Sequence, residues 1–179
     1  MRRMILMALG VLAASTSAFA QTPAELEIAL LAAPANLRDG ATVVKWKADF
    51  TYDTLRKGTN RLVCMDRSGQ PGQPPFVSEC TSIGNLERLA QNMKFETEPD
   101  RAKRQAALDA AEANGTRVKP EYGSVWYHVQ GADREKARNH MTIAVPGATT
   151  QSTGLPDNPK LGGVWIMNAG TTTAHLMTP

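Results

Sequence analysis

The stretch ATVVKWKADFTYDTLRKGTNRLVCMD, residues 41–66, decides what kind of sheet this chain builds. Its first part, ATVVKWK, alternates and contains β-branched residues, which predicts a short strand. The part from Phe50 to Asp66 predicts a β-hairpin, with its turn at Lys57–Asn60 and its return strand passing through Cys64. The whole stretch therefore predicts neighbouring antiparallel strands.

Four later runs also predict strands, because β-branched and aromatic residues stand between Gly and Pro borders. They are GSVWYHVQG, HMTIAVPG, GGVWIMNAG and TTTAHLMTP. Helical spacing of apolar residues predicts helices in TPAELEIALLAAPANL, in SIGNLERLAQNMKF with Ser82 as its cap, and in EPDRAKRQAALDAAEANG with a stop at Asn114–Gly115. We therefore expect an α+β fold: a single globular domain, residues 21–179, with an antiparallel sheet and about three helices packed on one face or end.

The first twenty residues, MRRMILMALGVLAASTSAFA, have the pattern of a secretory signal peptide. Arg2 and Arg3 precede an apolar run, and Ala18-Phe19-Ala20 fits the small-residue pattern that signal peptidase accepts. The apolar run is shorter than the roughly 20 residues that cross a bilayer. We expect cleavage before Gln21 and a periplasmic or secreted product.

Cleavage would change the charge balance of the chain. Residues 1–20 carry two of the 20 Lys and Arg, so 18 would remain against 17 Asp and Glu, and the net charge would fall from +3 to +1. Nucleic-acid binding needs a concentrated basic face, and no later segment is long and apolar enough to span a membrane. We therefore expect no nucleic-acid partner and no membrane insertion after cleavage, and the sequence leaves other partners open.

The two cysteines, Cys64 and Cys80, predict a disulfide bond, because an even number of cysteines in an exported chain is usually paired. The residues between them, MDRSGQPGQPPFVSE, are rich in Pro and Gly. Closing a loop of about 15 residues contributes about 3 kcal/mol in the chain-entropy model. A redox or metal-binding thiol pair is the alternative, but redox pairs usually have C-x-x-C spacing.

Three stretches, APANLRDGATVVKW, GTNRLVCMD and GGVWIMNAGTTTAHLMTP, resemble a family of uncharacterised exported bacterial proteins. The most specific part of that resemblance is a C-terminal pattern of W-x-M, G-T and A-H-L-M-x-P. Here the pattern falls on Trp165 to Met167, on Gly170-Thr171 and on residues 174–179. The resemblance implies a single exported domain, and it implies no particular chemistry.

Histidine and methionine are the residues in this chain that suggest a metal site. His175 and Met177 are two apart on a predicted strand and so share a face, and His140 or Met167 would supply a third ligand. Imidazole and thioether groups together favour a soft ion such as Cu(I). A four-residue loop would place His175 opposite Ile166, whereas a three-residue loop would place it opposite Trp165 with Met167 on the same face.

Three functions remain open at this stage, since the sequence has no nucleophile elbow, zinc-protease motif, P-loop or dinucleotide fingerprint. The first is a non-enzymatic binding or accessory module without a cofactor or any catalytic residue. The second is a periplasmic copper-binding protein that uses the His and Met residues above. The third is a hydrolase-like enzyme with His128 or His175 as its base. Methionine on a short strand is more often core than ligand. We therefore expect Leu176 to face the core and to pair with Trp165. If a helix covers the other face, we expect His175 to hydrogen-bond a backbone carbonyl or a hydroxyl group.

Overall fold

The structure is a computed structural model that describes residues 23–178, so the expected signal peptide and its cleavage site lie outside the described residues. The strands are β1 (Thr42–Trp46), β2 (Tyr52–Arg56), β3 (Leu62–Asp66), β4 (Phe76–Ser82), β5 (Val125–Gly131), β6 (Arg138–Ala144), β7 (Trp165–Met167) and β8 (His175–Met177). The α-helices are α1 (Pro23–Ala29), α2 (Ala35–Arg38), α3 (Leu86–Glu96), α4 (Arg101–Ala113) and α5 (Thr150–Thr153). Short 3-10 turns occur at η1 (Ile83–Asn85) and η2 (Pro159–Leu161).

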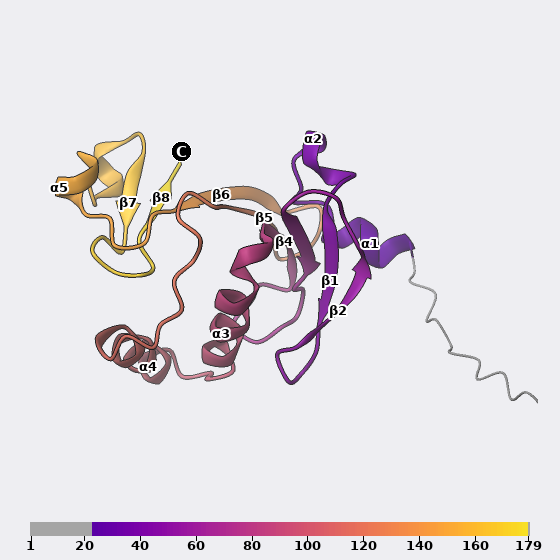
Figure 1. The fold of residues 1–179 in the computed structure, drawn as a ribbon, viewed down its shortest axis with the longest axis horizontal. Coiled ribbons are helices and arrows are strands. Elements are labelled where there is room, and N and C mark those ends of the chain that lie inside the picture. The colour runs from indigo at the N-terminus through magenta and orange to yellow at the C-terminus, as the bar shows by residue number, and fades with distance from the viewer. Residues whose placement is uncertain (1–22, 179) are drawn as a thin grey trace, which may run out of the picture.

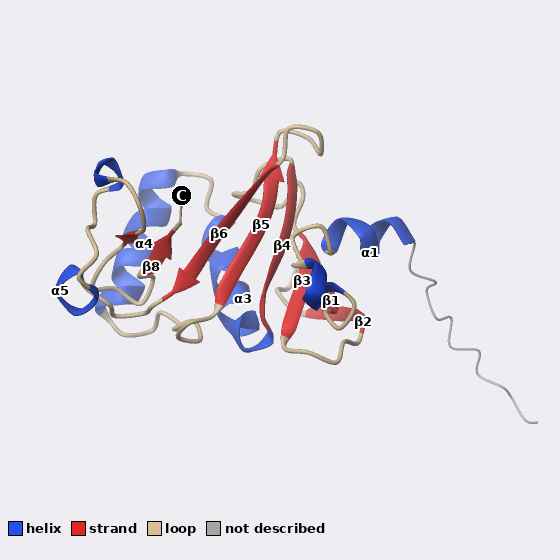
Figure 2. Ribbon diagram, turned by 90° about the horizontal axis from the view of Figure 1, so that it is seen from above, coloured by secondary structure: helices blue, strands red, loops and turns tan. Residues whose placement is uncertain are grey.

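The strands form one eight-stranded sheet in the order β2-β1-β3-β4-β5-β6-β8-β7 (Figures 1 and 2). Strands β1 and β3 pair in parallel, whereas the other neighbours pair antiparallel. The expected antiparallel α+β fold is therefore wrong: the sheet is mixed and dominates the molecule, and most of the helices are short.

The crossing of the chain at Gly58 explains the parallel pair. The predicted hairpin between residues 50 and 66 does not form, because β2 pairs with β1 and the chain then passes the start of β1. The backbone nitrogens of Thr59 and Asn60 donate to Gly40 O at 2.8 and 3.0 Å. A Cβ at position 58 would lie 2.5 Å from the carbonyl carbon of Ala41. Only glycine permits this approach, and β3 consequently begins on the other side of β1.

The helices lie on both faces of the sheet, which corrects the expectation that they share one face or end. Ala29 and Leu30 at the end of α1 pack in a cluster with Val43, Cys64 and Cys80. On the opposite face a second cluster joins the helix α3 to the sheet (Figure 2). Its buried members are Val44, Trp46, Val63, Met65, Leu89 and Met93. These two faces follow from the alternation of side chains along β1 and β3.

The predicted end of α4 is right, and the predicted cap of α3 is wrong. Helix α4 ends at Ala113 with Asn114 as its C-cap, and Gly115 follows with φ +73°. Ser82, the predicted cap of α3, is instead the last residue of β4, because its hydroxyl donates to the Glu121 carboxylate rather than capping a helix. The chain then makes the turn η1 before α3 begins at Leu86.

The C-terminal strands pair as expected but in a third register. His175 lies opposite Met167, and Leu176 lies opposite Ile166, so neither register derived from the loop length is right. Strand β8 is internal, since β6 pairs with its other edge. Leu176 packs against a small buried cluster that contains Ile166 and Ala174, which confirms its core-facing side but not the expected pairing with Trp165.

The Cys64–Cys80 disulfide bond is confirmed. The two residues are direct partners in the β3–β4 register, and their Cα atoms are 4.1 Å apart. Both side chains are fully buried in the cluster beneath α1.

No helix within residues 23–178 has the length and hydrophobicity of a membrane span.

Candidate functional site

The register of the central strands places ionisable side chains in one row on the α3 face of the sheet. Met65 lies opposite Glu79, Glu79 opposite His128, and His128 opposite His140. Side chains two residues apart on a strand share a face. His175 therefore joins this face through its partner Ala144, which stands four residues after His140.

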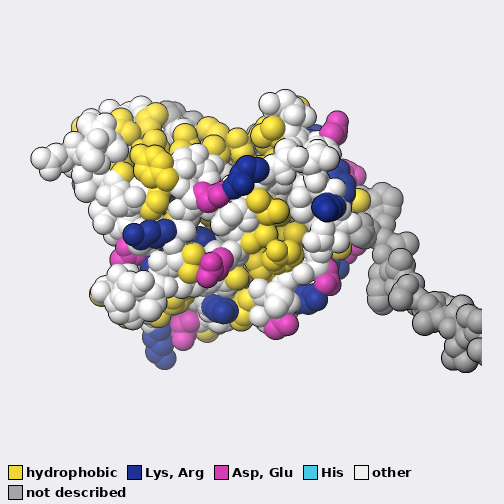
Figure 3. Space-filling model, in the orientation of Figure 1, with side chains coloured by type: hydrophobic (Ala, Val, Ile, Leu, Met, Phe, Trp, Pro, Cys, Tyr) yellow, Lys and Arg dark blue, Asp and Glu magenta, His cyan; other side chains and the backbone are white. Residues whose placement is uncertain are grey.

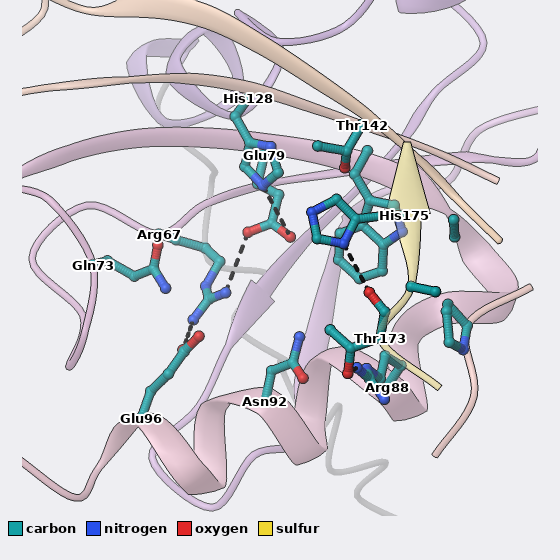
Figure 4. Close-up of a pocket in the computed structure, with 14 residues that line it drawn as sticks. Arg67, Gln73, Glu79, Arg88, Asn92, Glu96, His128, Thr142, Thr173 and His175 are labelled. Carbon is teal, nitrogen blue, oxygen red and sulfur yellow. Dashed lines mark hydrogen bonds and ion pairs between the residues drawn. The ribbon is translucent and has the colours of Figure 1, made fainter. Parts of the chain in front are cut away.

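A cavity of about 220 Å³ lies between this row and the helix α3 (Figure 4). Glu79, His128 and His175 line it from the sheet, and Asn92 and Glu96 line it from α3. Arg88, Asn92 and Glu96 follow each other at intervals of four, so they lie on one side of the helix. The side chains of His128 and Glu96 are 20% and 22% exposed, so solvent reaches the cavity.

A buried ion network forms one wall of the cavity. The Arg67 guanidinium donates from Nη1 to Glu79 Oε2 at 3.2 Å and from Nη2 to Glu96 Oε2 at 2.5 Å (Figure 4). Arg67 and Glu79 are each only 2% exposed. Burial would raise the pKa of Glu79, but His128 and Arg67 outweigh that effect and hold the pKa below its ordinary value. Glu79 is therefore a buried, ionised carboxylate.

His128 extends the network at the top of the cavity. Its Nε2 lies 3.7 Å from Glu79 Oε1, which is an ion-pair distance rather than a hydrogen bond. Its Nδ1 is buried and has no hydrogen-bond partner among the described residues. The ring of His140 lies beside it, with the two centroids 6.1 Å apart. Burial lowers the pKa of His140, and His128 and His175 lower it further.

His175 faces Glu79 across the cavity. Its Nδ1 lies 2.8 Å from Thr173 O (Figure 4). Because a carbonyl only accepts, Nδ1 must carry the proton. In the neutral ring Nε2 is then an acceptor, and Figure 4 shows the imidazole turned into the cavity toward Glu79. The expected backbone hydrogen bond of His175 is confirmed.

The helix side of the cavity is held by two arginines. Arg117 donates from Nη2 to Asn92 Oδ1 at 2.5 Å, which turns the Asn92 amide nitrogen toward the cavity (Figure 4). Arg88 donates to Val118 O and, at 2.8 Å, to Thr173 Oγ1. Burial first, and then Arg117, lower the pKa of Arg88 to about 10. Arg88 makes no ion pair within 4 Å among the described residues, so its hydrogen bonds and the more distant Glu112 carboxylate compensate its burial.

The proposed metal ligands share a face of the sheet but not the cavity. His140, Met167, His175 and Met177 all lie on the α3 face, and Met167 is the direct partner of His175. Of the four, only His175 lines the cavity. Within residues 23–178, no group of three or more His, Cys, Asp or Glu side chains is arranged to hold a metal ion. A copper site built on methionine sulfur stays a prediction.

Sequence reasoning missed Arg67, Glu79 and Asn92. One signal was present: Glu79 is an ionisable residue in the middle of FVSECTS, a strand otherwise of small and apolar residues. A buried carboxylate needs a partner, and Arg67 is a cation directly after the neighbouring strand β3. Asn92 carried no such signal, because it looks like any polar residue on a helix.

Comparison of the chain with protein-family models, with curated proteins and with solved structures finds no match. The function must therefore be argued from the cavity itself.

Proposed function

We propose that this protein is a non-enzymatic binding module that holds a neutral, hydroxyl-bearing small molecule between Glu79 and His175. The observation that carries the proposal is the pair of acceptors that face each other across the cavity. Among residues 23–178, Glu79 Oε1 has no hydrogen-bond partner, since His128 Nε2 is 3.7 Å away. His175 Nε2 is free to accept when the ring is neutral. Two hydroxyl groups of one molecule would satisfy both acceptors.

The charges around the cavity favour a neutral ligand. Two permanent cations, Arg67 and Arg88, stand in its wall with two carboxylates, Glu79 and Glu96, so the charges balance when His128 and His175 are neutral. A charged ligand would leave this balance uneven in a buried site, which is costly. The amide nitrogen of Asn92 adds a donor for a ligand oxygen. The cavity volume of about 220 Å³ is several times the roughly 30 Å³ that one water molecule occupies in the liquid, so the cavity has room for a small molecule.

Binding of neutral monosaccharides and polyols tests the proposal, with isothermal titration calorimetry and saturation-transfer NMR as readouts. We expect at least one member of the panel to bind, and Glu79→Gln and His175→Ala each to weaken that binding about tenfold or more, since each removes an acceptor that faces the cavity. Glu27→Gln is the matched control, because Glu27 makes an exposed ion pair with Arg134. A panel without any binder, or variants that bind like the wild type, would refute the proposal.

A second function is favoured by the contact between Glu79 and His128. A carboxylate beside a histidine in a solvent-reached cavity is the arrangement of a general base, as in the hydrolase-like alternative. Slow hydrolysis of neutral glycosides or esters by the wild type, abolished in His128→Gln, would favour the enzyme. Binding of the same compounds without turnover, unchanged over hours, favours the binding module.

A further inference from the structure

We infer that the ligand carries an aromatic ring, and that a second, apolar cavity beside the first receives it. This inference rests on the proposed function, because it extends the same site. The second cavity, called the annex below, has a volume of about 310 Å³ and is lined by Trp46, Phe50, Pro71 and Met93. It lies between the β1–β2 hairpin, the β3–β4 loop and the C-terminal end of α3.

The annex and the polar cavity are neighbours. Arg67 and Glu96 line both, so their ion pair is a shared wall. The polar cavity alone is smaller than the roughly 300–1,000 Å³ typical of small-molecule sites, whereas the annex alone and the two together both fall within that range. Figure 3 shows hydrophobic side chains exposed as a group over the region between α3 and β1, with charged side chains around them.

The apolar surface of the annex suits a flat ring. The Trp46 indole nitrogen already donates to Met65 Sδ at 3.1 Å, so Trp46 needs no polar partner from a ligand. The ring of Tyr52 packs edge-on against Trp46, with centroids 5.3 Å apart, which holds the indole in place. The thioether of Met93 makes favourable contacts with aromatic rings.

The charged groups that line the annex, Lys47, Arg67 and Glu96, already have partners. Lys47 pairs with Asp53 at 2.7 Å, and Arg67 pairs with both Glu79 and Glu96. A charged ring substituent would therefore find no free counterion among the described residues that line the annex, and we infer an uncharged aromatic group. The guanidinium of Arg67 offers it a planar surface to stack against.

Phe50 provides an independent observation. Its φ is +65°, a left-handed conformation that is unusual for a bulky residue. Glycine would form this turn with less strain, so we infer that the contacts of the phenyl ring offset the backbone strain at Phe50. The ring packs against the Trp46 and Met93 cluster, and Lys94 Nζ lies 5.8 Å from its centroid. Both contacts hold Phe50 as a wall of the annex.

The experiment compares three neutral probes on the whole protein: phenol, a sugar that binds the polar cavity, and the phenyl glycoside of that sugar. The phenyl glycoside should bind about tenfold or more tightly than the free sugar, because burying the ring removes apolar surface from water. Phenol alone should shift the Trp46 indole NMR signal. Both effects should disappear in the Phe50→Gly variant. Glycine is chosen because it adopts φ +65° without strain, so the variant removes the ring and keeps the turn.

Asn168→Gly is the control, because Asn168 also has a positive φ, +54°, but lies in the β7–β8 turn outside the annex. Thermal unfolding of each variant shows whether it folds. Equal affinity for the sugar and its phenyl glycoside would overturn the inference and leave the proposed function standing. If no sugar binds, the proposed function fails. The annex would still be supported if phenol shifts the Trp46 signal in the wild type but not in the Phe50→Gly variant. Phenol that leaves Trp46 unperturbed overturns the annex itself.

Discussion

Glu79 on β4 and His128 on β5 are direct partners in the sheet register, and the carboxylate of this pair is among the most buried polar groups in the molecule. The Arg67 guanidinium contacts the other carboxylate oxygen. The sheet thus uses a buried ionic row where most sheets bury aliphatic side chains. The stability of the protein and the chemistry of its cavity depend on the same residues.

Glu79 should make the protein sensitive to acid. Since its folded pKa is lowered, the stabilisation is fully present above the ordinary unfolded value of about 4.3 and is lost as the pH falls through the folded pKa. At pH 7, Glu79→Gln should lower the free energy of unfolding by about 3–5 kcal/mol, because it leaves the buried Arg67 partly unpaired. Urea unfolding from pH 7 to pH 3 measures both effects. The control Glu27→Gln alters an exposed ion pair and should change the free energy of unfolding by less than about 1 kcal/mol. If the stability of Glu79→Gln and of the wild type depended on pH in the same way, this account would be wrong.

His140 should titrate below its ordinary pKa of 6.5, because burial disfavours its charged form and His128 and His175 lie nearby. A folded pKa below the unfolded one means that the folded state loses stability as the pH falls through 6.5 toward the lowered value. NMR titration of the imidazole signals, assigned with His140→Gln, measures this pKa. In His128→Gln the pKa of His140 should rise, and an unchanged value would show that His128 does not contribute.

Removing the Cys64–Cys80 bond should destabilise the protein without changing ligand affinity. The bond closes a separation of 16 residues, and the Cys64→Ala, Cys80→Ala double variant should lose about 2–5 kcal/mol. The bond lies in the cluster beneath α1, on the face of the sheet opposite the cavity. Urea unfolding and ligand titration of the variant measure both quantities. Free thiols in the native, unreduced protein would contradict the prediction.

Gly58→Ala should prevent stable folding, because the added methyl group would overlap the backbone of Gly40 and Ala41 at the crossing of the chain. Overpacking usually costs about 1–3 kcal/mol, and more where backbone must move. Circular dichroism and thermal unfolding measure the effect. Gly69→Ala serves as the comparison: its φ is +69° but nothing lies within 4 Å of the added Cβ, so it should cost only about 1–2 kcal/mol. Equal effects of the two substitutions would show that the crossing is not tightly packed.

Copper binding should not depend on His175 and Met177. The free nitrogen of His175 turns into the polar cavity, which neither Met167 nor Met177 lines. Anaerobic titration of the wild type and of the His175→Ala, Met177→Ala double variant with Cu(I) should show no difference, while the variant loses about 1–3 kcal/mol of stability because Met177 is half-buried. A tight stoichiometric site that disappears in the double variant would make the copper function the leading one.

Local chemistry explains which features the sequence predicts well. The helix α4 ends at Asn114–Gly115 because a residue in a left-handed conformation stops a helix wherever it stands. The strands near the C-terminal end follow from β-branched and aromatic runs between Gly and Pro. The disulfide bond follows from the number of cysteines and the expected export. None of these depends on which distant segment packs against them.

Partners that are distant in sequence explain the failures. The parallel pairing of β1 and β3 depends on one close backbone approach at Gly58, which looks like an ordinary hairpin turn in the sequence. The site depends on registers that bring Glu79, His128 and His175 to one face, and a shift of one residue would separate them.

The sequence by itself therefore determined the strand runs, the α4 helix and the cysteine pair, because spacing and turn residues act within a few positions along the chain. Only the tertiary structure decided the mixed sheet, the opposite placement of α1 and α3, and the Arg67–Glu79–His128 cavity. Those features arise from contacts between segments that are far apart in the chain, and the buried charge of Glu79 is stable only where the fold supplies its partners.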